Sequence, residues 1–317
     1  MSFPYVHELE TRTLLSEYQG KKDARTLKSW RDKGGYQRVR KAIEMSPDTI
    51  TDVVKESGLR GRGGAGFPTG LKWSFMPKED GKPHYLCCNA DESEPGAFKD
   101  REIIRWTPHL LIEGCLIGAR AIGAEHVYIY VRGEFFEDTQ HLNKAVVEAY
   151  EAGFVGSNIM GSTWNCDITI HTGAGAYIAG EETGLMNSLM GNRAEPWAKP
   201  PFPAQAGVFG MPTTVNNVET LSTVPGIIEH GSEWYRQWGS EKSPGTKLWS
   251  CSGHLVRPGN YEIALGVPLR DIIFDVCGGT PSGKPVKAVI PGGSSTAFLS
   301  ADELDCATTY EGMQEVG

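Results

Sequence analysis

The stretch Gly61-Arg-Gly-Gly-Ala-Gly-Phe-Pro-Thr-Gly-Leu-Lys-Trp73 decides the function class of this chain. Glycine has no Cβ, so backbone N–H groups can converge on one point and a ligand can approach the main chain closely. Pro68 suits the first turn of a helix, whose positive end attracts anions, and Lys72 adds a positive charge one turn further on. The stretch predicts a phosphate cradle for a nucleotide or flavin; the alternative is a flexible surface turn.

The sequence before these glycines excludes an ordinary Rossmann fingerprint. Gly61, Gly63 and Gly66 satisfy G-x-G-x-x-G, but that fingerprint requires a strand just before the first glycine. Residues 46–57 are instead typical of a helix, with Ser46 as its N-cap. The cradle is therefore expected in another nucleotide-binding fold.

The composition describes a soluble globular protein. The 317 residues are 39% apolar and 22% charged, enough for one large domain and a smaller one. A net charge of −8 argues against nucleic acid as the main partner. No apolar run approaches the about 18 residues that span a membrane, and the N-terminus resembles neither a signal nor a transit peptide. We expect a cytosolic protein without direct membrane insertion.

The cysteines do not predict a metal site. Seven are scattered along the chain and none forms a C-x-x-C pair. They are typical of reduced, mostly buried thiols, and no metal ligand is assigned among them.

Alternating strands and helices predict the fold. Apolar runs indicate strands at 85–88, 127–131 and 167–171, and helices at 108–123, with Thr107 as N-cap, and at 134–152. This order predicts an α/β fold with a doubly wound, mainly parallel sheet.

The chain divides into three predicted parts. Residues 1–45 form an N-terminal arm with a short helix near 36–45, and residues 46–240 form the α/β domain. Residues 245–317 form a small α+β module of β-grasp type, with strands at 246–253, 259–263 and 286–291 and a helix near 269–276. No closing strand is expected, so this module is predicted to be incomplete.

Acidic residues follow the first predicted strand. Asn89, Asp91, Glu92 and Glu94 stand at its carboxyl end, where open α/β sheets bind ligands; a solvated acidic turn is the alternative.

A second glycine-rich loop, at 172–185, follows the third predicted strand and carries Tyr177, Glu181 and Glu182. A carboxylate there could hold ribose hydroxyls and repel a 2′-phosphate, which favours NAD over NADP. Paired acids also suggest glycosidase chemistry, but no sugar-binding aromatic platform accompanies them.

Two later segments add candidate ligand contacts. Prolines stiffen the loop at 191–203, which holds Lys199 and Phe202, and Asn216 and Asn217 precede a helix that ends near residue 230. The alternative for the loop at 191–203 is a plain connector, and the alternative for the two asparagines is a helix cap.

Together these segments resemble the NADH- and FMN-binding flavoprotein subunit of respiratory complex I, the F-type subunit of bacterial NADH:quinone oxidoreductase. The resemblance runs in order from about residue 10 to the end. The matching pieces are Gly61–Trp73, Cys88-Asn-Ala-Asp-Glu92, Glu94-Pro-Gly96, Lys99-Asp-Arg101, His171-Thr-Gly-Ala-Gly175, Tyr177, Gly180-Glu-Glu-Thr183, Lys199-Pro-Pro-Phe-Pro203 and Val215-Asn-Asn-Val-Glu-Thr220.

The resemblance implies an NADH dehydrogenase subunit in which hydride passes from NADH to FMN and electrons continue through iron–sulfur clusters to quinone. No side chain is assigned as a catalytic acid or base. The implied FMN contacts are Gly61, Arg62, Gly63, Lys72, Asn89, Asp91, Tyr177, Gly180, Glu181, Asn216 and Asn217. The implied NADH contacts are Gly64, Phe67, Phe75, Glu92, Glu94, Glu182, Lys199 and Phe202, with Glu182 selecting NADH over NADPH.

The sequence departs from the family pattern at Gly184, Met190 and Trp197, and Trp197 could alter contacts to the dinucleotide phosphates. The family's downstream segment, which binds a [4Fe–4S] cluster through C-x-x-C-x-x-C and a further cysteine, is absent from these residues. We therefore expect a fragment or a chain truncated before that segment.

The implied partners are other peripheral-arm subunits, especially the thioredoxin-like [2Fe–2S] subunit and the large iron–sulfur subunit, on the cytoplasmic side of the bacterial inner membrane. Two alternatives stay open. One is the diaphorase subunit of an NAD-linked hydrogenase or formate dehydrogenase, and the other is a non-catalytic nucleotide-binding or assembly module.

Overall fold

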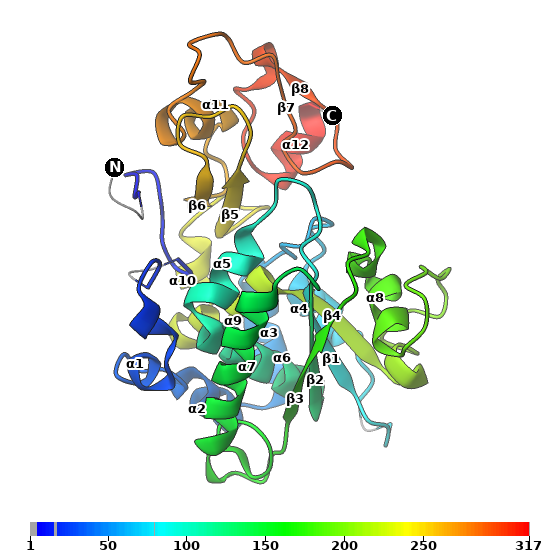
Figure 1. The fold of residues 1–317 in the computed structure, drawn as a ribbon. Helices are drawn as coiled ribbons and strands as arrows, with labels where there is room; N and C mark the ends of the chain where they lie inside the picture. The colour runs from blue at the N-terminus through cyan, green and yellow to red at the C-terminus, as the bar shows by residue number, and fades with distance from the viewer. Residues whose placement is uncertain (1–4, 16–17, 79, 317) are drawn as a thin grey trace.

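Four parallel strands form the centre of the larger domain (Figure 1). The computed structural model describes residues 5–15, 18–78 and 80–316. The strands lie in the order β3-β2-β1-β4, and every neighbouring pair is parallel. Their bounds are β1 Tyr85–Ala90, β2 His126–Val131, β3 Asp167–Thr172 and β4 Thr213–Asn217. The predicted mainly parallel sheet is confirmed.

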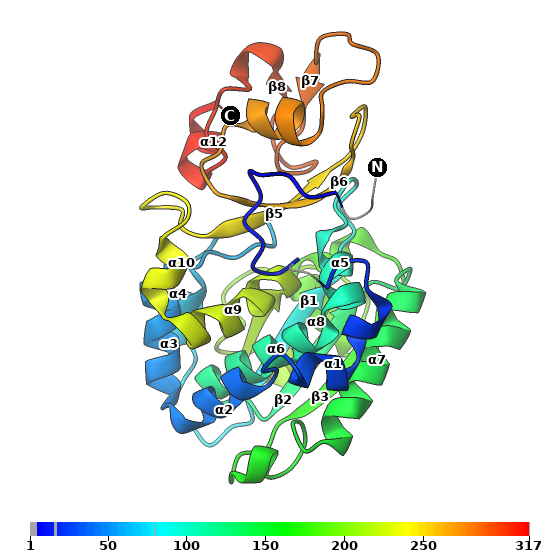
Figure 2. The same ribbon diagram turned by 90° about the vertical axis from the view of Figure 1, so that its left-hand side faces the viewer.

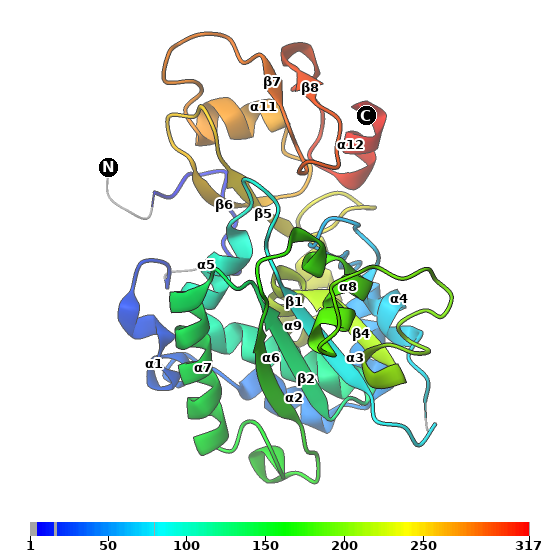
Figure 3. The same cartoon turned by 45° about the vertical axis from the view of Figure 1, so that its right-hand side comes forward.

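Helices cover both faces of this sheet (Figures 1 and 3). On one face lie α6 (Pro108–Ile122), α7 (Phe136–Glu151) and α9 (Val218–His230), and on the other lies α8 (Glu182–Leu189). Successive side chains of a strand point to opposite faces, so Leu86 and Cys88 join the large core while Cys87 joins a smaller core beneath α8. The sheet is therefore doubly wound, as predicted.

The strand order creates a switch point between β1 and β4. The chain moves outward from β1 to β2 and β3, and then returns to place β4 on the opposite side of β1. In open α/β sheets, ligands bind outside the carboxyl ends of the strands at such a point. The fold thus marks the ends of β1 and β4 as the place to look for a site.

The remaining helices of the larger domain surround this core. They are η1 (Lys22–Arg25), α1 (Leu27–Arg31), α2 (Gln37–Glu44), α3 (Pro47–Glu56), α4 (Thr69–Ser74), α5 (Lys99–Trp106), η2 (Ile159–Gly161), η3 (Tyr177–Gly180), η4 (Val208–Gly210) and α10 (Ser232–Arg236). The predicted cap of α3 is confirmed, since the Ser46 hydroxyl accepts from the Thr49 N–H at 3.1 Å.

Two local details differ from the expected capping. Thr107 is the N-cap residue of α6, as predicted, but its side chain makes no capping bond; its hydroxyl donates to the Ile103 carbonyl at 3.2 Å because α5 ends directly before α6. Pro68 precedes α4 in an extended conformation rather than occupying its first turn, because it still pairs with Arg60 across the glycine loop.

The smaller domain lies above the carboxyl ends of the sheet (Figure 1). Its elements are the antiparallel pair β5 (Thr246–Cys251) and β6 (Gly259–Ala264), α11 (Leu269–Asp271), the π-helical turn η5 (Ile272–Val276), β7 (Ala288–Val289), β8 (Leu299–Ser300), η6 (Ala301–Glu303) and α12 (Tyr310–Val316). β8 pairs antiparallel with β7, and the last element of the described residues is α12. Two-residue strands carry no periodicity, so the sequence could not reveal β8.

The N-terminal arm joins the two domains, running from the smaller domain down to α1 (Figure 2). Glu10 forms a bridge to Ile263 of β6. The buried Glu262 carboxylate accepts from the backbone N–H groups of Leu14 and Leu15, at 2.8 and 3.0 Å. Among the described residues, no helix combines the length and the apolar character that crossing a bilayer requires.

The close crossing of α6 and α9 yields a stability prediction. A Cβ on Gly114 would lie 2.1 Å from the Leu221 carbonyl oxygen, whereas a Cβ on Gly118 would meet side-chain ends at 3.2 Å or beyond. Gly114→Ala must push the helices apart and should lower the free energy of unfolding by about 3 kcal/mol. Gly118→Ala, on the same helix, should lower it by less than about 1 kcal/mol, because flexible side chains can yield and alanine favours the helix. Urea unfolding measures the free energy of unfolding of both variants. Equal losses in the two variants would contradict the close contact between α6 and α9 at Gly114.

Candidate functional site

The ends of β1 and β4 bring predicted contacts from separate segments together. The paired strands place Asn89 opposite Asn217. The side-chain amide oxygen of Asn216 accepts from the Trp73 indole N–H of α4 at 2.8 Å, and the Asn89 amide donates to the Gly180 carbonyl at 2.8 Å. The switch point therefore gathers α4, β1, β4 and η3 around one position.

The first glycine loop lies against the end of β4. It is a hairpin-like turn in which the Gly61 N–H donates to the Phe67 carbonyl at 2.9 Å. A Cβ on Gly63 would lie 3.2 Å from Asn217 Cβ, so the loop packs directly on the strand end. Gly64 has φ +123° and nothing within 4 Å of its Cβ position. The loop thus offers open space beside its main chain, as a phosphate cradle requires.

The second loop closes on the same place. A Cβ on Gly180 would lie 3.1 Å from the Asp91 carbonyl oxygen, a tighter contact than most side chains make, so the second loop lies close against the end of β1. Asp91 is half-buried, and its carboxylate accepts from the Ser93 hydroxyl at 2.7 Å. Burial raises the pKa of Asp91. Both glycine loops therefore flank the switch point.

A charge cluster stands beside the first loop. The Lys72 amine lies 2.6 Å from one Glu182 oxygen, and the Lys199 amine lies 2.5 Å from the other. Lys72 also donates to the Val215 carbonyl of β4 at 2.8 Å. Burial alone would raise the pKa of Glu182, but Lys72 and Lys199 outweigh it and lower that pKa. The carboxylate is therefore ionised and remains partly exposed.

The adjacent acids Glu181 and Glu182 interact with different partners. Each negative charge is therefore stabilised separately, although the two residues are neighbours in the sequence. The Glu181 carboxylate caps α8 by accepting from the backbone N–H groups of Thr183 and Gly184, at 2.8 and 2.9 Å. Glu182 faces the two lysines instead. The arrangement does not fit a glycosidase pair, in which both carboxyl groups flank one bond.

Large aromatic side chains are exposed among the predicted contacts. Phe67, Phe75, Phe202 and Tyr177 are between 46 and 56% exposed, and the Phe67 and Phe75 rings lie 6.1 Å apart between centroids. Exposed apolar side chains that lie together, as Phe67 and Phe75 do, are typical of a surface that a ligand or a partner covers. Their flat faces suit the stacking of a heterocyclic ring.

Arg62 cannot offer its side chain to a ligand. It is 2% exposed, and its guanidinium donates to the carbonyls of Thr246 and Pro244 and to the Tyr235 hydroxyl, the last at 2.7 Å. Its backbone N–H is engaged as well and donates to the Thr220 hydroxyl at 2.8 Å. The arginine joins the loop to the smaller domain, a tertiary role that no local pattern signals.

Glu92 likewise has a structural task. Its carboxylate is buried and accepts from the backbone N–H groups of Lys99, Asp100 and Arg101 at 2.8 to 3.2 Å, which caps α5. Burial, helped by Asp100, raises the pKa of Glu92 to about 7. Because α5 was not predicted from the sequence, the need for this cap went unnoticed.

A buried ionic network behind Asn217 was also missed. The Lys99 amine lies 2.7 Å from Asp100 and 2.8 Å from Glu219, and the Asn217 amide donates to Asp100 at 2.6 Å. Glu219 in turn accepts from the Leu248 N–H of β5 at 2.8 Å. The motif Lys99-Asp-Arg101 was the one available signal for this network.

The smaller domain also reaches the site. The Glu94 carboxylate accepts from the Tyr177 hydroxyl at 2.6 Å and from the Ser294 backbone N–H at 2.5 Å. Ser294, 200 positions further along the chain, thus orients Glu94, which is one of the predicted NADH contacts. Sequence reasoning had no signal for Ser294.

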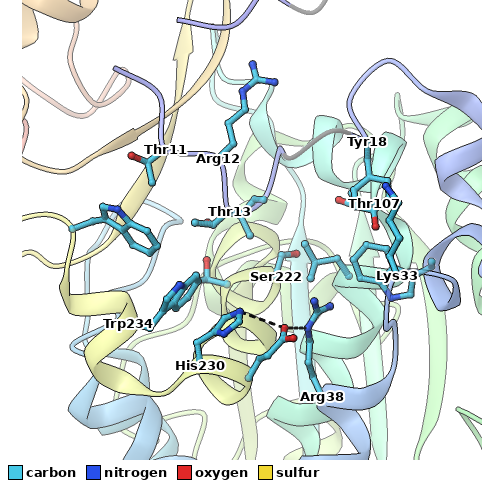
Figure 4. Close-up of a pocket in the computed structure, with 17 residues that line it drawn as sticks. Thr11, Arg12, Thr13, Tyr18, Lys33, Arg38, Thr107, Ser222, His230 and Trp234 are labelled. Atoms are coloured by element: carbon cyan, nitrogen blue, oxygen red, sulfur yellow. Dashed lines mark hydrogen bonds and ion pairs between the residues drawn. The ribbon is translucent and has the colours of Figure 1, made fainter. Parts of the chain in front are cut away.

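One cavity lies elsewhere, between the N-terminal arm, α9 and α10 (Figure 4). It measures about 390 Å³. Glu229, in the wall of this cavity, pairs with Arg38 at 2.5 Å and with His230 at 3.6 Å. These three charged groups of the cavity therefore already have partners. None of the predicted contacts lines it, and we do not place the site there. Within the described ranges, no cluster of three or more His, Cys, Asp or Glu side chains is suited to a metal ion.

Two family models match the chain. One is described as the Nuo51 FMN-binding domain and matches residues 54–226; the other is described as an SLBB domain and matches residues 247–314.

Similar proteins share about half of their residues with the chain. An F-type subunit of the NADH-quinone oxidoreductase of Rhizobium meliloti (strain 1021) is 51% identical, over 93% of this chain and 70% of that protein. The corresponding F-type subunit of Mycobacterium tuberculosis (strain ATCC 25618 / H37Rv) is 54% identical, over 89% of this chain and 64% of that protein. The chain therefore spans about two thirds of the length of these relatives.

A solved structure shares the fold. The NAD⁺-reducing [NiFe]-hydrogenase in the H₂-reduced state superposes with a TM-score of 0.79 at 38% identity. The match covers 90% of this chain and 48% of the hydrogenase chain.

The raised pKa of Glu92 predicts a pH dependence of stability. Its pKa in the folded chain is about 7 against 4.5 ordinarily, so its contribution is complete below about pH 4.5 and is lost as the pH rises through 7. Glutamine does not titrate, so Glu92→Gln should lack this pH-dependent loss. Between pH 4.5 and 7.5 its unfolding free energy should fall by roughly 1–3 kcal/mol less than that of the wild type. Urea unfolding at both pH values measures it.

The exposed Glu137→Gln serves as the control and should leave the fall unchanged. Buried acids that do not interact with Glu92 titrate in both proteins and cancel, whereas Asp100 interacts with Glu92 and contributes to the measured difference. An identical fall in wild type and Glu92→Gln would contradict the assigned burial.

Proposed function

This chain belongs to the family of the FMN-binding F-type subunit of NADH-quinone oxidoreductase, and we propose that it binds NADH and passes a hydride from it to FMN at the carboxyl ends of β1 and β4. The observation that carries the proposal is the convergence of both glycine loops, Lys72 and the paired asparagines on one switch point. Bound FMN supplies the redox chemistry, accepting a hydride and releasing electrons singly.

The residues present fit a flavin mononucleotide. The first loop packs through Gly63 on Asn217 at the end of β4, where its backbone N–H groups can meet a phosphate, and the Lys72 amine is partly exposed nearby. We assign FMN binding to Gly61, Gly63, Lys72, Asn89, Asp91, Tyr177, Gly180, Glu181, Asn216, Asn217 and the backbone of Arg62. These groups orient the flavin ring relative to the nicotinamide. No proton-transferring side chain is needed, because the protein accelerates hydride transfer by positioning the two rings.

We assign NADH binding to the exposed rim. Phe67, Phe75 and Phe202 offer faces for stacking, and Gly64 allows close approach of the dinucleotide. Glu182, held between two lysines, can accept from ribose hydroxyls. Glu94 and Lys199 complete the set, whereas the carboxylate of Glu92 is engaged as a helix cap and does not support its predicted contact.

As a member of this family, the chain works with other complex I subunits. We further propose that its direct partners are the thioredoxin-like [2Fe–2S] subunit and the large iron–sulfur subunit, on the cytoplasmic side of the inner membrane. We also propose the division into the arm 1–45, the nucleotide-binding domain 46–240 and the β-grasp-like domain 245–317. In this proposal, electrons leave through clusters carried by these subunits and by the [4Fe–4S] segment typical of the family.

A diaphorase role beside a hydrogenase is the second candidate, favoured by the structural likeness to the NAD⁺-reducing enzyme. It is the weaker one, because identity to that protein is 38%, against 51 and 54% to the complex I subunits.

Ferricyanide reduction tests the function directly, since it needs NADH and flavin but no cluster. The chain, reconstituted with FMN and freed of excess flavin, should reduce ferricyanide with NADH in a saturable manner. A sample treated identically without FMN is the control. No turnover by a sample that retains stoichiometric FMN would favour the non-catalytic nucleotide-binding module.

Glu182 should decide between the two nicotinamide nucleotides. Glu182→Gln removes the negative charge that repels a 2′-phosphate, so the ratio of NADPH to NADH kcat/KM should rise roughly tenfold, equal to about 1.4 kcal/mol. Glu195→Gln, an exposed acid paired with Arg193, is the matched control and should leave the ratio unchanged. An unaltered ratio in Glu182→Gln would remove the assignment.

A further inference from the structure

A second cavity lies between the first glycine loop and the smaller domain. It measures about 310 Å³, within the range of small-molecule sites. Gly64 and Ala65 form one wall, and β5 and α12 contribute Lys247, Trp249 and Tyr310 to the others. Of the predicted FMN and NADH contacts, it includes Gly64 alone. The cavity is therefore a neighbour of the proposed flavin site rather than a part of it.

The charges around this cavity have one sign. Two of the lining residues, Arg60 and Lys247, are cationic, and among the described lining residues none is Asp or Glu. The Lys247 amine lies 4.9 Å from the Trp249 ring centroid and 5.9 Å from that of Tyr310, and no ion pair of Lys247 occurs among the described residues. Arg60 stacks on Tyr310 at 4.0 Å and donates to the Gly66 carbonyl. Neither cation meets a carboxylate there.

Burial makes this arrangement costly without a counter-charge. Burial lowers the pKa of Lys247 to about 8, opposed by Glu219, so the amine is still largely protonated at pH 7. The Lys247 side chain is half-buried and forms no ion pair among the described residues, so the cation–π contacts and the charge of Glu219 offset the cost of its desolvation only in part. The cavity of about 390 Å³ differs in this respect, because its Arg38 and His230 both face Glu229.

A second, independent feature also points to a missing acceptor. Trp249 is 8% exposed, and its buried indole N–H has no hydrogen-bond partner. Buried donors in native structures normally find an acceptor, which a ligand can supply. The remaining wall is largely apolar, with Leu265, Leu299 and Met313, and carries the hydroxyls of Thr296 and Thr308.

We propose that this cavity binds a small organic anion, a carboxylate or a phosphate monoester with a compact apolar body, with its charged head at Lys247 and Arg60. The apolar wall takes the body of the ligand. Because Gly64 and Ala65 belong to the glycine loop, the ligand also contacts that loop. The proposal does not depend on the function of the flavin site.

Calorimetric titration with benzoate tests this site, with benzamide as the uncharged isostere. Benzoate should bind at one site per chain, and benzamide at least about tenfold more weakly. Lys247→Met, which keeps the stem and removes the charge, should weaken benzoate binding about ten- to a hundredfold, whereas Lys247→Arg should restore it. Lys284→Met, at an exposed lysine of the same domain, is the matched control and should bind benzoate as the wild type does.

The titration is repeated with inorganic phosphate, and with benzoate on protein saturated with FMN. Stronger binding of phosphate than of benzoate would identify a phosphate head as the preferred group. Equal binding of benzoate and benzamide, unchanged affinity in Lys247→Met, or competition between benzoate and FMN would each overturn the proposal. Should Lys247→Met not fold, a bromide-soaked crystal of the wild type decides: an anomalous peak beside Lys247 supports the site, and its absence contradicts it.

Discussion

The parallel pairing of β1 with β4 is the constraint on which the rest of the structure depends. It places Asn89 beside Asn217 although more than a hundred residues separate them, and it reverses the direction in which strands are added to the sheet. In open α/β sheets, ligands bind outside the carboxyl ends of the strands where the strand order reverses in this way. The first glycine loop packs on Asn217 at the end of β4 and the second is bonded to Asn89 at the end of β1, so this pairing brings the two loops together.

The smaller domain is part of the site's construction. The buried guanidinium of Arg62 fixes the glycine loop to the carbonyls of residues 244 and 246, and Glu219 links the start of α9 to β5. Leaving any one of these buried charges unpaired would cost several kcal/mol. The conformation of the glycine loop therefore depends on the smaller domain remaining docked against it. The contact of Ser294 with Glu94 extends this coupling to the rim where we propose that NADH binds.

The sequence was sufficient wherever a structure follows from local chemistry. The apolar runs of β1, β2 and β3, the Ser46 cap and the two glycine loops all fall in this class, and the order of elements determined the fold class. β4 was missed because Thr213-Thr-Val-Asn-Asn217 is short and polar, and it is a strand only because β1 offers it an edge. For a similar reason, the sequence could not show that the Arg62 guanidinium and the Glu92 carboxylate have structural partners: those partners come from a distant domain and from a helix that was not predicted.

The central claim is that one flavin occupies the switch point between the two glycine loops. A crystal structure of the chain soaked in FMN tests it most directly. We predict density for a single isoalloxazine between the Gly61–Gly66 turn and the Gly180–Glu182 segment, with its phosphate close to Lys72. Flavin density at any other place, such as the cavity beside Trp234, with an empty crevice at the ends of β1 and β4, would contradict the account.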